Sequence, residues 1–586
     1  MKKLFEIIVV CILCLIANNT FAVYITPQEA LNIADKILSS KQSGFSFRAP
    51  SNVKSELSIA SQSEAYYVIN VGTNGFLIIS ADDELPELLG YSKERIYCEE
   101  SISPALRMWL NNYDREIQIW RNTISYHNKR LVNRSQNDGR EPIDPLLSTK
   151  WGQDFPFNNY CPTDCQGKKC PIGCVTTAIA QIMNYWEWPQ KGYGEHSFEY
   201  ICTEDSTDRR ILSVNLESTQ YHWENMVDDY GFGGQSSVDM TTSDQQDAVA
   251  TLMYHIAVAQ NAHFSYQGTW LSFREIRQHT FPSLFSHFDY DNNVQVFAKD
   301  YCNIDSLETF LYDELLDGRP IFVVGADSAK GGHAFVCDGY ENHYFHFNWG
   351  WNGLGDGWFR LSALNPSMLF VGSYEFNSFV QFFTGIKPKK NQSPIKHYGN
   401  VWVADEVTVS PYSYEKLPDD LIYESPFINI YEVKIEGMAN ASITNHTGFF
   451  NIALYPCGSD EFVQLITSCP ACPFPDEHDF FYGEMKAAWP NFETKLSQDL
   501  ASGEYSVVPV YTDKQGKWVP ISLLNGKSFP TIKIQRGIRI GEPASIYTTM
   551  GQLVYRTLDW QGLDSQLPSG LYLVKRGTDA IKLYKR

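Results

Sequence analysis

A cysteine at the start of a helical pattern is the residue of this chain best suited to chemistry. Cys174 follows Gly173 and opens a run whose apolar residues recur at helical spacing: Val175, Ala178, Ile179 and Ile182. This spacing predicts a helix with one buried face. Unpaired backbone N–H groups in its first turn, together with the helix dipole, favour a thiolate, which attacks carbonyl carbon. A buried cysteine that merely begins a core helix fits this segment equally well.

A histidine and an asparagine follow the cysteine in a suggestive order. Residues 331–340 and 344–351 read as two strands joined by a tight turn, which should bring Asn348 roughly opposite His333 on one sheet. The histidine lies 159 positions after Cys174, and the asparagine lies 15 positions further on. In this order the thiolate attacks, the imidazole moves the proton and the amide orients the ring. A lone histidine on a strand is otherwise a core residue.

A loop before the cysteine offers a fourth functional group. Gln153 lies in the loop 150–158, about 20 residues upstream of Cys174. Its amide could act with the backbone N–H of Cys174 to bind a developing oxyanion, and one such donor lowers the barrier by roughly 3 kcal/mol. Glutamines on loops are mostly solvated, so Gln153 gains weight as a member of an ordered set of Gln, Cys, His and Asn.

Several segments together resemble the streptopain family of bacterial cysteine peptidases. The likeness covers residues 145–388 and rests on these segments: 173–175, 180–185, 221–226, 332–336, 348–351, 359–361 and 385–388. The resemblance implies a papain-like fold with Cys174 as nucleophile and His333 as base. It also implies that Trp349 packs beside the contact between Asn348 and His333. No metal and no organic cofactor is needed for this chemistry.

Length and composition limit the remaining possibilities. With 586 residues the chain is too long for one core, and three or four domains are expected. Aromatic residues make up 14% and charged residues 20%, which favours folded, β-rich domains over disorder. The formal net charge of −21 argues against nucleic acid and against an anionic membrane surface as partners.

The first 22 residues have the pattern of a signal peptide. Lys2 and Lys3 precede an apolar run from residue 4 to 16, and the small residues Thr20 and Ala22 suit cleavage before Val23. No later stretch of about 20 apolar residues predicts a membrane span. We therefore expect a protein that is secreted or displayed on the cell surface.

Cysteine spacing allows two readings near the nucleophile. Four cysteines fall within 14 residues: Cys161, Cys165, Cys170 and Cys174. A zinc site is rejected because it would consume the nucleophile. A bridge from Cys161 or Cys165 to Cys170 is expected instead, since disulfides persist in exported chains.

Cys469 and Cys472 have the spacing of a redox motif without an activating helix, so a local disulfide or two thiols are expected there.

Residues 23–140 are expected to form an inhibitory propeptide. A helix is predicted from Thr26 to about Leu38, and strands at 65–71 and 75–80. The segments 75–83 and 89–92 are similar to the streptopain propeptide, although a small independent domain is the alternative. The stretch 128–140 is basic and polar, so we expect it to be exposed and cleaved, with Arg140 as the last residue cut away.

The chain beyond the peptidase-like part changes to short strands separated by turns. This pattern predicts a β-sandwich over residues 389–535. Residues 536–586 resemble the sorting domain of the type IX secretion route, with the step Leu567-Pro568-Ser569-Gly570 and a basic end. Such a domain would contact the secretion machinery. Another short β-module is the alternative.

The sequence thus predicts an α+β chain: an α+β propeptide, a papain-like peptidase over residues 141–388, and β-sandwich modules. The expected function is a secreted cysteine endopeptidase, made as a zymogen, with protein or peptide substrates and its own propeptide as inhibitor. Two alternatives remain. An acyltransferase on the same framework would pass the acyl group to an amine, and a catalytically idle surface adhesin would use the β-modules for binding.

Overall fold

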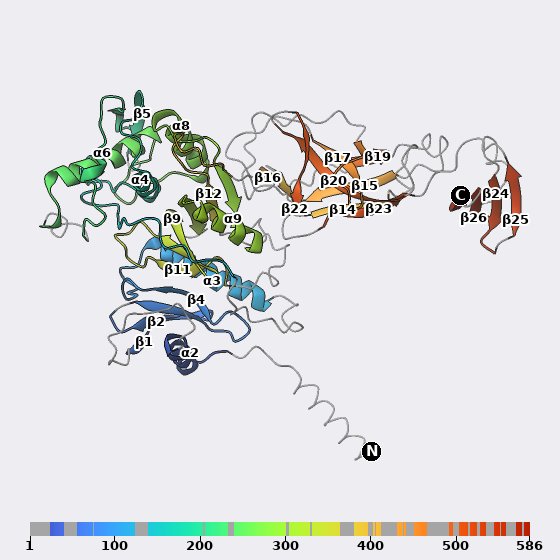
Figure 1. Cartoon of the computed structure of the whole chain (residues 1–586), viewed down its shortest axis with the longest axis horizontal. Helices are drawn as coiled ribbons and strands as arrows, with labels where there is room; N and C mark the ends of the chain where they lie inside the picture. The colour runs from blue at the N-terminus through green and yellow to red at the C-terminus, as the bar shows by residue number, and fades with distance from the viewer. Residues whose placement is uncertain are drawn as a thin grey trace, which may run out of the picture. The chain divides into compact units, whose positions relative to one another are not determined.

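The computed structural model describes part of the chain, which Figure 1 shows in colour. The described residues are 24–39, 56–73, 75–122, 139–202, 205–231, 239–299, 304–327, 331–363, 380–395, 402–404, 406–411, 430–436, 439–440, 450–465, 492–495, 503–513, 516–523, 528–534, 544–550, 552–557, 570–576 and 579–585. The predicted signal peptide, the cleavage stretch up to residue 138, and Cys469 and Cys472 lie outside them. The chain divides into two compact units, and the first comprises Met1–Tyr398 with Ser442–Thr444.

The first elements of this unit are two helices and four antiparallel strands. Their bounds are α2 Pro27–Ser39, β1 Leu57–Gln62, β2 Tyr66–Val71, β3 Phe76–Ser80, β4 Leu88–Ser92 and α3 Pro104–Asn122. α2 begins with a capping box, in which the Thr26 N–H donates to the Glu29 carboxylate at 2.8 Å and the Glu29 N–H donates to Thr26 Oγ1 at 3.3 Å. The helix and both strands predicted for this segment are confirmed. α3 is an element that the sequence analysis does not predict.

Ten strands of the first unit form one sheet. The later strands are β7 Gln295–Ala298, β8 Ile321–Asp327, β9 Gly331–Glu341, β10 Tyr344–Asn348, β11 Gly357–Arg360 and β12 Val380–Thr384. The order across the sheet is β1-β2-β3-β4-β11-β10-β9-β8-β12-β7. β4 pairs with β11, with Tyr91 opposite Trp358, so the two groups of strands join edge to edge (Figure 1).

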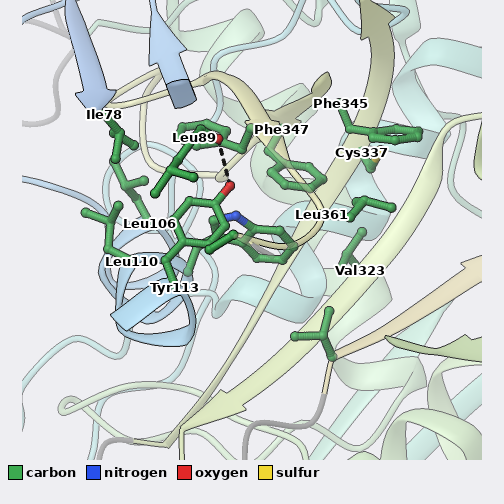
Figure 2. Close-up of a cluster of buried hydrophobic side chains, with 14 of the residues drawn as sticks. Ile78, Leu89, Leu106, Leu110, Tyr113, Val323, Cys337, Phe345, Phe347 and Leu361 are labelled. Carbon is green, nitrogen blue, oxygen red and sulfur yellow. Dashed lines mark hydrogen bonds between the residues drawn. The ribbon is translucent and has the colours of Figure 1, made fainter. Parts of the chain in front are cut away.

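One face of this sheet is covered by α3. Figure 2 shows Leu106, Leu110 and Tyr113 of this helix beside side chains of the later strands. Phe335 on β9 and Phe347 on β10 belong to the same buried cluster. We call this side of the sheet the α3 face.

The remaining helices and a hairpin complete the first unit. They are α4 Cys174–Trp186, β5 Glu195–Ile201, β6 Arg209–Asn215, η2 Trp223–Asn225, α6 Ser243–Ala259, α7 Phe273–Glu275, η3 Ile276–Thr280, α8 Phe281–His287 and α9 Ile304–Leu316. The predicted helix at Cys174 and the two predicted strands after residue 330 are confirmed as α4, β9 and β10. The mixed α+β class is confirmed as well.

The second unit consists of strands where the structure describes it. They are β13 Trp402–Ala404, β14 Glu406–Pro411, β15 Ile430–Glu436, β16 Ala439–Asn440, β17 Phe450–Pro456, β18 Gln464–Leu465, β19 Phe492–Lys495, β20 Gly503–Thr512, β21 Trp518–Pro520, β22 Ser522–Leu523, β23 Thr531–Ile534, β24 Ala544–Thr548, β25 Leu553–Thr557, β26 Gly570–Arg576 and β27 Asp579–Lys585. β24 to β27 form a separate four-stranded sheet in the order β25-β24-β26-β27. The predicted change to short strands is thus observed.

The disulfide of the first unit differs from the expected one. Cys165 is bonded to Cys202, which lies 37 positions away, and Cys161 carries a buried thiol. The expected bridge from Cys161 or Cys165 to Cys170 is therefore wrong. This bridge depends on the tertiary fold, because Cys202, which directly follows β5, lies next to the loop of Cys165. The local spacing of the cysteines does not predict that contact.

Arg140 is also placed differently from the exposed loop that we expect. Its guanidinium donates to Thr309 Oγ1 at 2.7 Å and lies 3.9 Å from Glu308. Three residues later, Ile143 and Tyr340 exchange two backbone hydrogen bonds of 2.7 and 2.9 Å. The segment that starts at Arg140 is thus bound alongside β9.

Among the helices of the described residues, none has the length and apolar character to cross a bilayer.

Candidate active site

Cys174 is the first residue of α4 and lies beside a close backbone approach. Gly173 has a φ of 91°, and a Cβ atom there would lie 2.6 Å from the carbonyl oxygen of Thr269. A side chain at this position is therefore excluded by both conformation and space. Val175 and Ile179, which follow on α4, are buried and fix the start of the helix against the core.

Two opposing effects act on the pKa of the Cys174 thiol. Burial raises its pKa, although hydrogen bonds from the backbone N–H groups of Ala334, Val175 and Cys174 itself act in the opposite direction. The expected helix-terminus donors are therefore present, but desolvation outweighs them. Burial therefore opposes the thiolate that the helix terminus favours.

His333 lies on the α3 face of the sheet. It is paired with Gly325 of β8, and paired residues of neighbouring strands share a face. A Cβ atom on Gly325 would lie 2.6 Å from the terminal carbon of Met108, so this α3 side chain fills the space beside His333. Burial lowers the pKa of His333 to about 4, which keeps the imidazole neutral.

Asn348 lies on the opposite face, towards α4. It is paired with Val336 and not with His333, because the pairing shifts by one residue between His346 and Phe347. The expected register of this hairpin is therefore wrong. A β-bulge inserts an extra residue in β9 at this point and reverses which side chains face α4.

A buried glutamine of α4 holds Asn348 in place. Gln181 is fully buried, and its Nε2 donates to Asn348 Oδ1 at 3.1 Å. Its Oε1 accepts hydrogen bonds from Thr149 Oγ1 at 3.0 Å and from the Trp151 N–H at 3.3 Å. The Asn348 amide in turn donates to the Thr149 carbonyl at 2.6 Å. The sequence analysis gives Gln181 no role, although a polar side chain seven residues after Cys174 on the buried stripe of the helix is a usable signal.

The loop of Gln153 runs against the first turn of α4. The Gln153 carbonyl accepts from the Ile172 N–H at 2.9 Å, and the Gly152 carbonyl accepts from Thr177 Oγ1 at 3.1 Å. These bonds place the half-buried Gln153 next to the residues that lead into Cys174. Gly152 leaves room for the Asn352 side chain, which would have to move if residue 152 carried a Cβ atom, because the two would lie 2.5 Å apart.

Trp349 is buried on the α3 face. Its Nε1 donates to the Gly355 carbonyl at 2.7 Å, and its ring lies 4.7 Å from that of Phe335 and 6.3 Å from that of Trp109 on α3. In this structure it therefore packs between the strands and α3.

The five residues are thus brought together in two groups. Cys174, Gln153 and Asn348 gather around α4, whereas His333 and Trp349 lie on the α3 face. Within the described residues, no hydrogen bond or ion pair joins Cys174 to His333. In the same ranges, no three His, Cys, Asp or Glu side chains gather as metal ligands would.

Two protein families match parts of this chain. Residues 151–359 match the Peptidase C10 family, and residues 22–117 match the Spi protease inhibitor family. The first match contains α4, β9 and β10 with the five candidate residues. The second contains α2, the strands β1 to β4 and most of α3.

Several known proteins are similar over the same region. The thiol protease/hemagglutinin PrtT of Porphyromonas gingivalis is 29% identical over 360 residues, which are 56% of this chain and 38% of PrtT. Streptopain of Streptococcus pyogenes is 29% identical over 342 residues, which are 55% of this chain and 80% of streptopain. A solved structure of a prointerpain A fragment of Prevotella intermedia is 29% identical, with a TM-score of 0.47, and covers 57% of this chain and 99% of that fragment.

The expected resemblance to streptopain is therefore confirmed for the first unit. The chain spans well under half the length of PrtT and most of streptopain. Residues 151–359 are thus similar to the Peptidase C10 family, and residues 22–117 before them are similar to the Spi protease inhibitor family.

Proposed function

We propose that this chain is the precursor of an exported cysteine endopeptidase that hydrolyses peptide bonds through an acyl-enzyme. Cys174 is the nucleophile, and His333 is the base that takes its proton. Asn348 orients the imidazole, and Trp349 shields that contact once it forms. Gln153 and the backbone N–H of Cys174 stabilise the oxyanion.

The observation that carries this proposal is the convergence of distant segments at Cys174. The backbone N–H of Ala334, the residue that directly follows His333, is close enough to the Cys174 thiol to lower its pKa. The loop of Gln153 is hydrogen-bonded to Ile172, two residues before the cysteine. Asn348 is tied to the same helix through Gln181. Segments that carry Cys174, His333, Asn348 and Gln153 thus all reach α4, which supports assigning the four residues to one site.

The proposed reaction follows from these roles. His333 takes the thiol proton, and the thiolate attacks the substrate carbonyl carbon to form a tetrahedral intermediate. The amide of Gln153 and the Cys174 N–H donate to its oxyanion. The imidazolium then gives its proton to the leaving amine, and water hydrolyses the thioester to release the second product and the free thiol.

The described arrangement supports an inactive precursor. A neutral His333 faces Met108 of α3, and burial raises the pKa of Cys174 at the start of α4. Proton transfer between them needs His333 to move to the α4 face. Because Met108 and Trp109 pack on the face that His333 now occupies, removal of α3 is the step that frees the histidine.

The same proposal assigns the other parts of the chain. Residues 1–22 direct export, and residues 23–140 form the inhibitory propeptide that cleavage releases. The peptidase comprises residues 141–388 and is followed by a β-sandwich over 389–535. Residues 536–586 contact the type IX secretion machinery. The mature protein acts outside the cell or on its surface.

Replacement of the nucleophile tests this proposal. Cys174→Ala should lower kcat/KM for casein by about 10⁴-fold or more, because the covalent step is lost. It should also leave the precursor uncleaved if maturation is autocatalytic. Cys457→Ala is the matched control, since Cys457 is an exposed cysteine of the second unit, and this variant should cleave casein at the wild-type rate.

The two alternatives give different results in the same assay. An acyltransferase would form amide products when an amine is added to the casein digest, and its hydrolysis would fall accordingly. An adhesin would cleave nothing, and the Cys174→Ala variant would then equal the wild type. Wild-type casein cleavage by Cys174→Ala would end the proposal.

A further inference from the structure

A buried carboxylate links α3 to the peptidase-like strands. Glu116 is 6% exposed, and its Oε1 pairs with the Lys299 ammonium, which is 8% exposed. Its Oε2 accepts from Ser362 Oγ at 2.8 Å and from the Ala363 N–H at 2.8 Å. The carboxylate is therefore matched by an ammonium, a hydroxyl and a backbone N–H. A buried charge is tolerated when it is paired and hydrogen-bonded in this way.

All three donors belong to the part of the chain that would remain after propeptide release. Lys299 directly follows β7, and Ser362 and Ala363 follow β11. The carboxylate belongs to the segment that would leave. The three donors therefore form a pocket on the peptidase-like part, and the carboxylate on the proposed propeptide is the ligand of that pocket.

Apolar and aromatic contacts surround this pocket on α3. Tyr113 and Trp109 lie one and two turns before Glu116 on the same side of the helix. The Tyr113 hydroxyl lies within hydrogen-bond distance of two carbonyl oxygens, that of Arg360 at 2.6 Å and that of Leu89 at 2.9 Å, and Figure 2 shows the contact with Leu89. The Lys299 ammonium lies 5.5 Å from the Trp109 ring centroid. The pocket is thus closed by α3 itself, which excludes water and strengthens the charge pair.

A second ion pair across the same boundary differs in exposure. Lys150 Nζ lies 2.6 Å from Glu94 Oε2, but these side chains are 39% and 44% exposed. Solvent screening makes such pairs weak. Glu116 and Lys299 thus form a buried ion pair between the two segments, whereas Glu94 and Lys150 form an exposed pair of the same chemistry.

We propose that Lys299, Ser362 and the Ala363 N–H form a carboxylate-binding pocket, and that Glu116 is the ligand by which the propeptide locks onto it. The pocket recognises a carboxylate carried on a helix with aromatic neighbours. This proposal rests on the inhibitory role assigned above to the propeptide. It adds the site at which the inhibitor is held and the group that it presents.

The test uses the full chain carrying Cys174→Ala, so that it stays intact, and follows hydrogen exchange of the α3 amides by mass spectrometry. Added Glu116→Gln should raise their exchange rate by at least about 30-fold, because one partner of a buried charge pair is lost. Glu94→Gln, the matched surface control, should raise it by less than about fivefold. Exchange in α6 should not change with either substitution.

The pocket side is tested by Lys299→Met and by the milder Ser362→Ala, which removes one hydrogen bond and should raise exchange about three- to tenfold. The double variant Glu116→Gln/Lys299→Met should exchange more slowly than the product of the two single effects predicts. The proposal would be overturned if Glu116→Gln and Glu94→Gln raised the α3 exchange rate equally. It would also be overturned if the increase in the double variant equalled the product of the two single increases. Because no turnover is measured, these outcomes are independent of whether the chain hydrolyses peptide bonds.

Discussion

At the scale of single residues, the candidate site depends on how polar groups are satisfied around α4. Asn348 has its oxygen bonded by Gln181 Nε2 at 3.1 Å and by the Gly350 N–H at 3.0 Å. The same glutamine accepts two hydrogen bonds from the loop that leads to Gln153. In the proposed mechanism Gln181 is therefore a positioning residue, which would hold Asn348 and the loop of Gln153 relative to Cys174 without touching substrate.

Replacement of Gln181 by Leu should therefore impair both stability and turnover. Loss of its amide removes the buried acceptor of the Thr149 hydroxyl and the Trp151 N–H and one of two donors to Asn348 Oδ1, which should cost about 2 kcal/mol of unfolding free energy or more. In the processed enzyme kcat should fall by about tenfold or more while KM changes little, because positioning rather than binding is lost.

Urea denaturation and steady-state peptide hydrolysis measure the two effects. Gln190→Leu is the control, since Gln190 is an exposed glutamine of the same part of the chain. Equal kinetic constants for Gln181→Leu and Gln190→Leu would show that Gln181 does not position the site.

At the scale of elements, the hairpin of β9 and β10 decides where the histidine points. The turn residues Asn342 and His343 have φ values of 48° and 71°, which suits a two-residue turn. In an unbulged hairpin the alternation of side chains would put His333 on the same face as Asn348. The register shift between His346 and Phe347 moves it to the α3 face instead.

The sequence could predict part of this arrangement. Helical spacing and glycine position predict α4, and apolar alternation predicts both strands of the hairpin. The bulge, the Cys165–Cys202 bridge and the packing of α3 could not be predicted, because each depends on segments distant in sequence. Leu106, Leu110 and Tyr113 have helical spacing, but nothing local shows that they cover the strand of His333.

The buried position of His333 predicts a dependence of precursor stability on pH. Its pKa is lowered from 6.5 to about 4 in the folded precursor, so the unfolded chain binds the proton first as pH falls. The contribution of the neutral imidazole to stability is therefore present above pH 6.5 and is lost as pH falls towards 4. Asp356, whose pKa burial raises to about 7, acts in the opposite direction and must be held constant.

Melting temperatures of the Cys174→Ala precursor with and without His333→Asn isolate this effect. The parent should lose about 3 °C or more relative to the His333→Asn variant between pH 7 and pH 4. Asp356 is the same in both proteins and cancels in the difference. A difference that stays constant across this range would place His333 in a solvated position.

At the scale of the whole molecule, the segments that match the Spi protease inhibitor and Peptidase C10 families share one sheet and one buried cluster. β4 pairs with β11 within a ten-stranded sheet, and α3 shares a buried cluster with β8 to β11. Inhibition is therefore expected to come from a joint core that holds His333 away from Cys174, together with the buried Glu116 carboxylate. Release of the propeptide should change the reactivity of one thiol in the chain.

Labelling with a thiol-directed epoxide, followed by mass spectrometry of intact chain and peptides, tests this account most directly. After processing, one equivalent of label should be found on Cys174, and casein hydrolysis should be lost in proportion. In the intact precursor, Cys174 should react at least about 100-fold more slowly, because burial raises the pKa of its thiol and its proposed base faces α3. A processed protein that cleaves casein while Cys174 remains unlabelled would contradict the account.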